Sequence, residues 1–216
     1  MVVNEFKTDI QSTSANDEPH KPAVLFICGS PRTNGMSARI MECAIAGAEE
    51  AGVEIKRLYL ADYSVTPCHG CDACMETGEC CFTGTNGDDF DLIEEYFEEA
   101  DAAMLFSPLY FAGPPAMLKC VFDRFQPYWV RRYVKKEEMP PNRLIHQFVI
   151  GAGNDPFGEG PTVAITKSAF NVFGFRTAAV HNYIGYSNVS SDEEREQFEA
   201  DARAAAYDFA KSLLEA

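Results

Sequence analysis

The sequence has no apolar run that approaches the roughly 20 residues needed to cross a bilayer. Its first stretch, MVVNEFKTDIQSTSANDEPHKP, contains no hydrophobic signal segment. Basic residues are also scarce: 18 Lys and Arg stand against 33 Asp and Glu, which gives a formal net charge of −15. Such a chain repels nucleic acid and anionic lipid. We therefore expect a cytoplasmic protein that has no nucleic acid and no membrane as its partner.

Several common nucleotide-binding and catalytic patterns are missing as well. No G-x-G-x-x-G occurs, which excludes the dinucleotide fingerprint. Five residues, not the four of a Walker loop, separate Gly29 from Gly35, and Met36 stands where that loop needs Lys. No Ser/His/Asp or Cys/His constellation indicates hydrolysis. His146 and His181 fall in expected strands and favour core or surface roles, so we name no catalytic acid or base.

Cysteine, by contrast, is plentiful, with eight residues in a chain of 216. Thiols stay reduced in the cytoplasm, so these cysteines indicate metal or redox chemistry instead of structural disulfides. Cys28, Cys43 and Cys120 fall on an expected buried strand or on helices, where Cys acts as a small core residue. The other five lie between Cys68 and Cys81.

Apolar periodicity predicts strands that alternate with helices from residue 22 onward. The expected strands are residues 23–28, 53–60, 102–107, 144–150 and 175–184. Such alternation implies a parallel α/β sheet covered by helices on both faces. We expect residues 1–21 to be a disordered tail and residues 22–216 to form one domain. Two connections, 61–87 and 127–143, are too long for plain linkers, and the first is a cysteine-rich insertion.

The first strand runs into GSPRTNGMS (29–37) and then into a helix. Backbone N–H groups and the helix dipole at such a junction suit an anion. Ser30, Asn34 and Ser37 add polar donors, and Arg32 adds a cation. A mononucleotide phosphate fits this loop, with a glycine-capped turn that holds no ligand as the alternative.

Two further loops follow the third and fourth strands. SPLYFAGPPAMLK (107–119) presents Tyr110 and Phe111, which either cover a planar ring or belong to the core. GAGNDPFGEG (151–160) carries four glycines, so a ligand could approach its backbone closely. Loops at the carboxyl ends of parallel strands flank the place where ligands sit in open α/β sheets.

The cysteine cluster Cys68, Cys71, Cys74 and Cys80 reads C-x2-C-x2-C-x5-C. This spacing is similar to the bacterial ferredoxin run that curls around an iron-sulfur cluster, although the last gap is longer and no Pro follows. Cys81 is a second candidate for the fourth ligand. Bare thiols, zinc and a redox disulfide stay open as alternatives.

The sequences GSPRTNGMS and SPLYFAGPPAMLKCVFDRF, together with the cysteine cluster, resemble in their order and spacing the flavodoxin-like NAD(P)H-dependent FMN reductases over about residues 22–184. The iron-sulfur flavoprotein branch is the most similar. The resemblance implies a flavodoxin-like, doubly wound five-stranded parallel sheet of order 2-1-3-4-5. It also implies that the first loop holds the FMN phosphate and that the other two line the isoalloxazine. The residues it implicates are Ser30, Arg32, Asn34, Gly35, Met36, Ser37, Pro108, Leu109, Tyr110, Phe111, Gly113, Gly151, Ala152 and Gly153.

In the iron-sulfur flavoproteins the compact cysteine arrangement carries a 4Fe-4S cluster, which the resemblance assigns here to Cys68, Cys71, Cys74 and Cys80. Lys119, Asp123 and Arg124 match the family's LK…DR stretch, and we expect the last two to be structural or at a subunit contact. Segment 126–143, with the only Trp, is expected at a subunit interface, over a neighbour's flavin, or as solvated surface.

The functional hypothesis is an FMN-containing oxidoreductase, a homodimer or homotetramer, with a 4Fe-4S centre. It would pass electrons from NAD(P)H or ferredoxin to a small-molecule acceptor such as a quinone, a flavin or an oxygen species. The alternatives are a flavodoxin-like electron carrier with no substrate of its own, an FMN reductase that lacks the cluster, and a thiol-based redox sensor.

Overall fold

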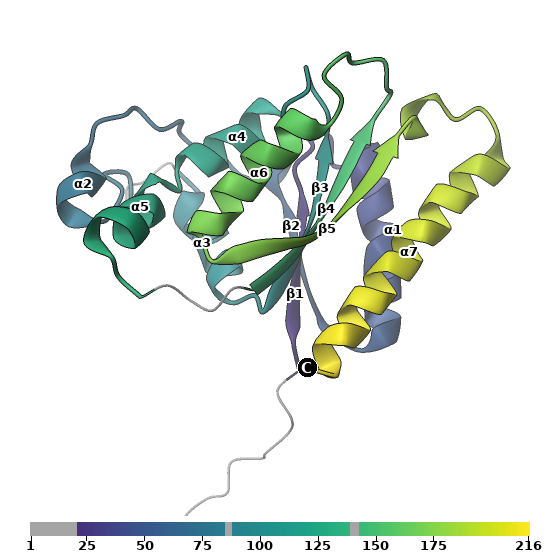
Figure 1. Cartoon of the computed structure of the whole chain (residues 1–216), viewed down its shortest axis with the longest axis horizontal. Helices are drawn as coiled ribbons and strands as arrows, with labels where there is room; N and C mark the ends of the chain where they lie inside the picture. The colour runs from purple at the N-terminus through teal and green to yellow at the C-terminus, as the bar shows by residue number, and fades with distance from the viewer. Residues whose placement is uncertain (1–20, 85–87, 139–142) are drawn as a thin grey trace, which may run out of the picture.

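Five parallel strands form the centre of the molecule (Figure 1). The computed structural model describes residues 21–84, 88–138 and 143–216. The strand order is β2-β1-β3-β4-β5, which confirms the predicted flavodoxin-like sheet. All five predicted strands are present, and their ends agree within one residue. The strands are β1 (Ala23–Cys28), β2 (Glu54–Tyr59), β3 (Ala102–Pro108), β4 (Arg143–Gly151) and β5 (Phe175–Ile184).

Helices cover both faces of the sheet, as predicted (Figure 1). Alternate residues of a strand point to opposite faces, so one strand serves two cores. Val24 and Phe26 of β1 pack in the core with α1 and α7, whereas Leu25 and Ile27 pack in the core with α3, α4 and α6. The helices are α1 (Met36–Ala51), α3 (Phe90–Glu98), α4 (Ala116–Asp123), α6 (Gly160–Val172) and α7 (Asp192–Leu214).

The ends of α1 and α7 follow local sequence signals. Gly52 ends α1 at a φ of 102°, where its N–H caps the carbonyls of Ala48 and Glu49. Ser191 begins α7, and its hydroxyl accepts the N–H of Glu194 at 3.2 Å, which is the N-cap bond of a capping-box sequence. Midway along α1, a Cβ at Gly47 would lie 2.1 Å from the Arg203 carbonyl oxygen, so glycine allows the close packing of α1 on α7.

The two long connections form short helices that pack together beside the sheet. The first holds η1 (Leu60–Asp62) and α2 (Ala73–Thr77), and the second holds α5 (Gln126–Trp129) and the π-helical turn η2 (Val130–Lys135). Helix α2 contacts both α5 and η2, and the group projects from the left of the molecule in Figure 1. The short helix η3 (Tyr186–Asn188) follows β5.

No helix in the described part of the chain is long and apolar enough to span a bilayer. The predicted N-terminal tail lies almost wholly outside the described residues.

A pair of histidines lies between the sheet and α7. The Nε2 atom of His181 and the Nδ1 atom of His146 are 3.1 Å apart and share a hydrogen bond. The His146 ring stacks on Phe209, and the His181 ring stacks on Phe148. Burial, and to a lesser degree the neighbouring His181, lowers the pKa of His146 to about 4. Both rings are therefore packing groups at neutral pH, as expected from the sequence.

This pair makes the stability of the fold depend on pH. An unfolded His titrates near 6.5, so between pH 6.5 and 4 the unfolded chain binds a proton that folded His146 does not. The free energy of unfolding should therefore fall as the pH drops through this window. We expect His146→Leu to remove about 2 kcal/mol of the loss between pH 7 and pH 5. Urea unfolding of the wild type and of His146→Leu at pH 7 and pH 5 measures this difference in the free energy of unfolding.

His69→Asn is the matched control, because His69 is exposed in the cysteine loop and its replacement should leave the pH dependence unchanged. Equal losses in the wild type and in His146→Leu would show that the pair does not cause the effect.

Candidate functional site

The loop between β1 and α1 offers an anion several donors. Gly35 is the N-cap of α1, so no side chain caps the first N–H groups, and the first turn contains no acidic residue. Ser30 is buried, and its Oγ atom accepts the backbone N–H of Arg32 at 3.1 Å, which holds the loop in a tight turn. The loop thus presents free backbone N–H groups, hydroxyls and one cation at the carboxyl end of β1.

The loop after β3 has a fixed, strained shape. Tyr110 and Gly113 exchange backbone hydrogen bonds of 2.9 and 3.0 Å. The two residues between them, Phe111 and Ala112, have φ values of 51° and 59°, which residues other than glycine rarely adopt. The N–H of Leu109 donates to the Ile150 carbonyl at 2.9 Å and ties this loop to β4.

These loops enclose a cavity of about 180 Å³ at the carboxyl ends of β1, β3 and β4. Glycine is needed in its wall, because a Cβ at Gly151 would lie 3.0 Å from Ile184 Cδ1 and 3.3 Å from Leu109 Cβ. The cavity is lined by Ser30, Arg32, Gly35, Met36, Ser37, Pro108, Leu109, Tyr110, Ile150, Gly151, Ala152 and Ser187.

Most of the residues implicated from the sequence thus meet in one place, and four do not line this cavity. Asn34 lines an adjoining cavity of about 270 Å³, together with Arg39 and Arg195. Phe111 is fully exposed at the tip of its turn. Gly113 closes that turn through backbone hydrogen bonds, and Gly153 is at a φ of 91°.

Sequence reasoning missed Ser187, which lines both cavities. It lies on η3, and its neighbour Asn188 holds this turn in place by donating to the Ala152 carbonyl at 2.7 Å. A usable signal was present, because the carboxyl end of a fifth parallel strand lies at the same edge as the other loops.

The hydroxyls of Ser30 and Ser37, the cation of Arg32 and the first turn of α1 make a donor set that suits a phosphate. Leu109, Tyr110 and Ala152 provide apolar and aromatic surface beside it. The residues present therefore fit FMN.

A separate cavity of about 290 Å³, the cysteine cavity, lies in the projection formed by α2, α5 and η2. All five cysteines of the insertion line it. The rest of its wall is His69, Gly70, Asp72, Met75, Phe82, Asp123, Arg124, Gln126, Pro127 and Val130. Loop cysteines thus face side chains from the end of α4 and from the second long connection.

The thiols influence one another. The Sγ atoms of Cys71 and Cys81 are 3.4 Å apart. The backbone N–H of Ala73 and the Cys81 thiol lower the pKa of Cys71 by hydrogen bonding to its sulfur. Burial raises the pKa of Cys74, and the nearby charges of Cys68, Cys71 and Cys80 add to that increase. Cys81 is exposed, and its interactions with the Cys71 thiol and, to a lesser degree, with Cys80 raise its pKa.

Each of these thiols is therefore close to at least one other, and Cys81 interacts with both Cys71 and Cys80. In the described part of the chain, no three His, Cys, Asp or Glu side chains converge to hold a metal ion. The five cysteines lie along the wall of the cavity, and both Cys80 and Cys81 stay candidates for a fourth cluster ligand.

Arg124 is the buried cation of this wall. Its Nη1 atom donates to the Thr66 carbonyl at 3.1 Å and to the Asp88 carboxylate. Burial alone would raise the pKa of Asp88, but hydrogen bonds from the Phe90 N–H, Arg124 and the Thr66 N–H lower it. The sequence suggested a structural or subunit role for Arg124, whereas the structure places it beside the cysteines.

Part of the segment after Arg124 packs on the cysteine loop of the same chain. Gln126, Pro127 and Val130 line the cysteine cavity, and the Nε atom of Arg131 donates to the Gly78 carbonyl at 2.8 Å. Residues 126–131 thus cover this chain's own cysteine loop, and a role at a subunit interface or over a neighbour's flavin stays a prediction.

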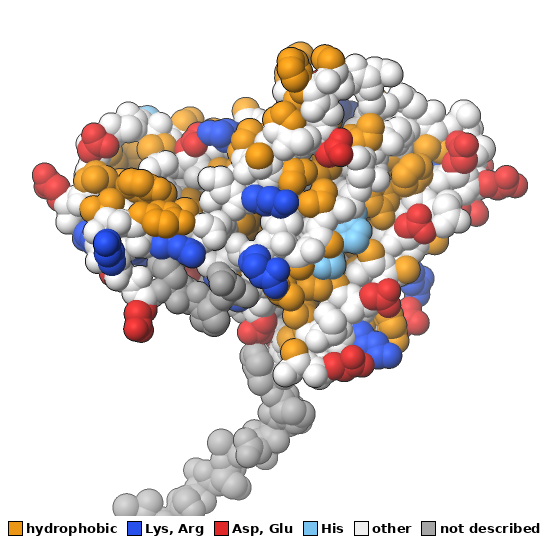
Figure 2. All heavy atoms as spheres, in the orientation of Figure 1, with side chains coloured by type: hydrophobic (Ala, Val, Ile, Leu, Met, Phe, Trp, Pro, Cys, Tyr) orange, Lys and Arg blue, Asp and Glu red, His pale blue; other side chains and the backbone are white. Residues whose placement is uncertain are grey.

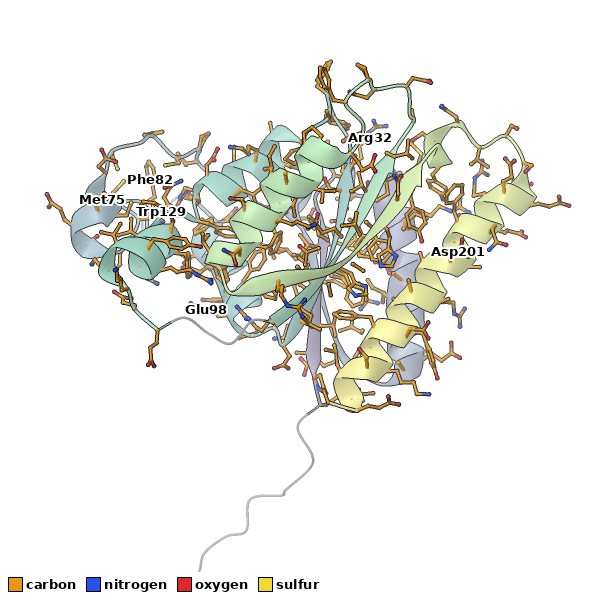
Figure 3. The ribbon with its side chains drawn as sticks, viewed as in Figure 1. Arg32, Met75, Phe82, Glu98, Trp129 and Asp201 are labelled. Atoms are coloured by element: carbon orange, nitrogen blue, oxygen red, sulfur yellow. The ribbon has the colours of Figure 1, made fainter. Side chains whose placement is uncertain are left out.

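The cysteine cavity and the cavity formed by the flavin loops have no lining residue in common. Figure 3 shows Arg32 at the strand ends, well apart from Met75, Phe82 and Trp129, which gather in the projection. Within one chain, the cysteines are therefore beside the sheet and not above the flavin loops.

Comparison with known proteins agrees with this geometry. The sequence model of the NADPH-dependent FMN reductases matches residues 22–181. The chain belongs to this family.

Sequence relatives of this reductase include an iron-sulfur flavoprotein of Methanocaldococcus jannaschii, 39% identical over 48% of this chain and 52% of the relative. An iron-sulfur flavoprotein of Archaeoglobus fulgidus is 33% identical over 50% of this chain and 48% of the relative. The chain thus spans about half the length of the curated relatives it matches.

Solved structures agree with the fold of the reductase. An NAD(P)H:quinone oxidoreductase from Methanothermobacter marburgensis has a TM-score of 0.64 at 19% identity, covering 88% of this chain and all of the other. A flavone reductase has a TM-score of 0.65 at 17% identity, covering 88% of this chain and 62% of the other.

The phosphate loop yields a test with two flavins. Arg32→Ala should weaken FMN binding about tenfold, which corresponds to about 1.4 kcal/mol, because it removes a charge-assisted contact. Riboflavin lacks the phosphate, so its affinity should be unchanged. Fluorescence titration of the apoprotein with each flavin measures both constants.

Arg57→Ala is the control, since Arg57 is an exposed cation on β2 paired with Glu49. An equal loss of affinity for FMN and riboflavin in Arg32→Ala would place Arg32 away from the phosphate.

Proposed function

We propose that this FMN reductase is an iron-sulfur flavoprotein that moves electrons from NAD(P)H or ferredoxin to a quinone, flavin or oxygen-species acceptor. The observation that carries the proposal is the cavity lined by all five clustered cysteines and by the buried Arg124. The names of the relatives support it, since the curated matches are iron-sulfur flavoproteins. The cysteine spacing supports a 4Fe-4S cluster.

Cys68, Cys71, Cys74 and Cys80 would hold the cluster, because their C-x2-C-x2-C-x5-C spacing is similar to that of a ferredoxin run and all four line the cavity. The cluster would exchange single electrons with the flavin, which itself accepts two as hydride. Apolar wall residues such as Phe82, Pro127 and Val130 would exclude water from it.

At the flavin site, the chain's own residues bind and orient. Ser30, Arg32 and Ser37 would hold the phosphate at the start of α1, which fixes one end of the cofactor. Tyr110 and Leu109, held by the strained turn, would set the plane of the ring. No described side chain in this cavity is needed as an acid or base, because hydride transfer to a flavin needs no proton donor in the protein.

We also propose that the protein is a homodimer or homotetramer in the cytoplasm. The separation of the two cavities within one chain supports an assembly that brings the cysteine cavity of one subunit to the flavin of another. Apolar side chains gather over α5 at the left of Figure 2, where Trp129, Tyr133 and Val134 are exposed. The net charge of −15 disfavours nucleic acid as a partner.

The fourth ligand can be identified by two serine variants. Cys80→Ser should lose most of the iron, whereas Cys81→Ser should keep it, because Cys80 is the fourth cysteine of the C-x2-C-x2-C-x5-C run. Iron and sulfide assays on anaerobically purified protein measure the content, with about four irons expected per wild-type chain.

The reverse pattern would assign the fourth position to Cys81. If the wild-type protein contains flavin and intact thiols but no metal, the proposal that it holds a cluster is wrong.

Stopped-flow mixing of the anaerobic protein with NADH or NADPH tests the donor. Rapid bleaching of the flavin is expected for a reductase that takes hydride directly. If the flavin does not bleach but is reduced rapidly by reduced ferredoxin, the reductase hypothesis is wrong, and the protein is an electron carrier that takes its electrons from ferredoxin.

A further inference from the structure

Arg124 is buried, but only one of its three side-chain nitrogens, Nη1, has hydrogen bonds among the described residues. The side chain is 1% exposed, yet its Nε and Nη2 atoms have no hydrogen-bond partner among the described residues. Its guanidinium lies against two aromatic rings, 4.5 Å from the Phe90 centroid and 5.0 Å from the Phe82 centroid. Among the described residues only Nη1 has hydrogen-bond acceptors, so much of the guanidinium charge is left for a second, negatively charged partner.

The cysteine cavity is where that partner can lie. Arg124 lines it, whereas Asp88, the counter-ion of Arg124, does not. The positive member of the ion pair is therefore in the cavity wall with the thiols, and the negative member is not. The buried nitrogens of Arg124 are closed to direct contact, so its charge would act on a negatively charged occupant through space.

From this geometry we propose that Arg124 sets the reduction potential of the cluster in the cysteine cavity, an inference that rests on the proposed function. Each electron taken up by a thiolate-bound cluster adds one negative charge to the cavity. A cation fixed in the wall stabilises that charge, and the burial of the guanidinium against Phe82 and Phe90 reduces its screening by water. Arg124 thus favours the reduced cluster, and Asp88 limits the effect from behind.

Variants of the two partners should shift the potential in opposite directions. Arg124→Gln removes the cation, so we expect a tenfold change of the one-electron equilibrium toward the oxidised cluster, or about 59 mV lower. Asp88→Asn removes the counter-charge and should raise the potential, while Arg124→Lys should retain part of the wild-type value. Anaerobic redox titration followed by electron paramagnetic resonance measures the cluster, and the flavin potential should stay constant.

Arg143→Gln is the matched control. Arg143 is another part-buried arginine, with hydrogen bonds to the Phe97, Ala100 and Phe173 carbonyls and a ring contact with Phe175, and it does not line the cavity. Shifts of the same sign in Arg124→Gln and Asp88→Asn would mean loosened packing and would overturn the proposal. An unshifted potential in Arg124→Lys and Asp88→Asn would overturn it too, even if Arg124→Gln failed to fold.

A second readout does not need the cluster. In the metal-free chain, the ratio of the alkylation rates of Cys74 by anionic iodoacetate and neutral iodoacetamide reports the local potential. We expect this ratio to fall at least threefold in Arg124→Gln, to rise in Asp88→Asn and to stay constant in Arg143→Gln. A metal-free wild type with this pattern would reject the proposed function but keep the role of Arg124, whereas constant ratios would reject that role.

Discussion

Parallel pairing of β1 with β2 on one side and β3 on the other is the constraint on which the molecule depends. Because neighbouring parallel strands run the same way, each connection must cross over the sheet, and helices therefore bury both faces. The same geometry brings every strand's carboxyl end to one edge. The phosphate loop, the strained Tyr110–Gly113 turn and Gly151 meet there although they are far apart in sequence.

The cysteine cavity depends on a different principle, because no sheet positions it. The described part of its loop contains the short helices η1 and α2, and it is held in place by contacts from elsewhere. Arg124 bonds to the Thr66 carbonyl at the start of the loop, and Arg131 bonds to the Gly78 carbonyl near its end. Both arginines belong to one continuous stretch, α4 to η2, that packs on the loop. A charge that would be costly alone in the interior is offset by Asp88 and by two aromatic faces.

The fold was predictable because its signals are local. The buried run Ala23–Cys28, the stop at Gly52 and the capping box at Ser191 each act within a few residues. The strand order came from resemblance, since periodicity alone predicts strands but not their neighbours. The flavin loops were largely predictable for the same reason as the fold, whereas Ser187 was missed because only its distance from β5 marks it.

The sequence by itself determined that the chain forms a parallel sheet, that an anion suits the loop after β1, and that five cysteines lie in one insertion. These are properties of neighbouring residues and of short-range periodicity. Only the tertiary structure decided that Arg124 lies in one cavity wall with those cysteines, that residues 126–131 cover them, and that the cavity is separate from the flavin loops. The physical reason is that burial and ion pairing join residues distant in sequence, and their partners are chosen by packing.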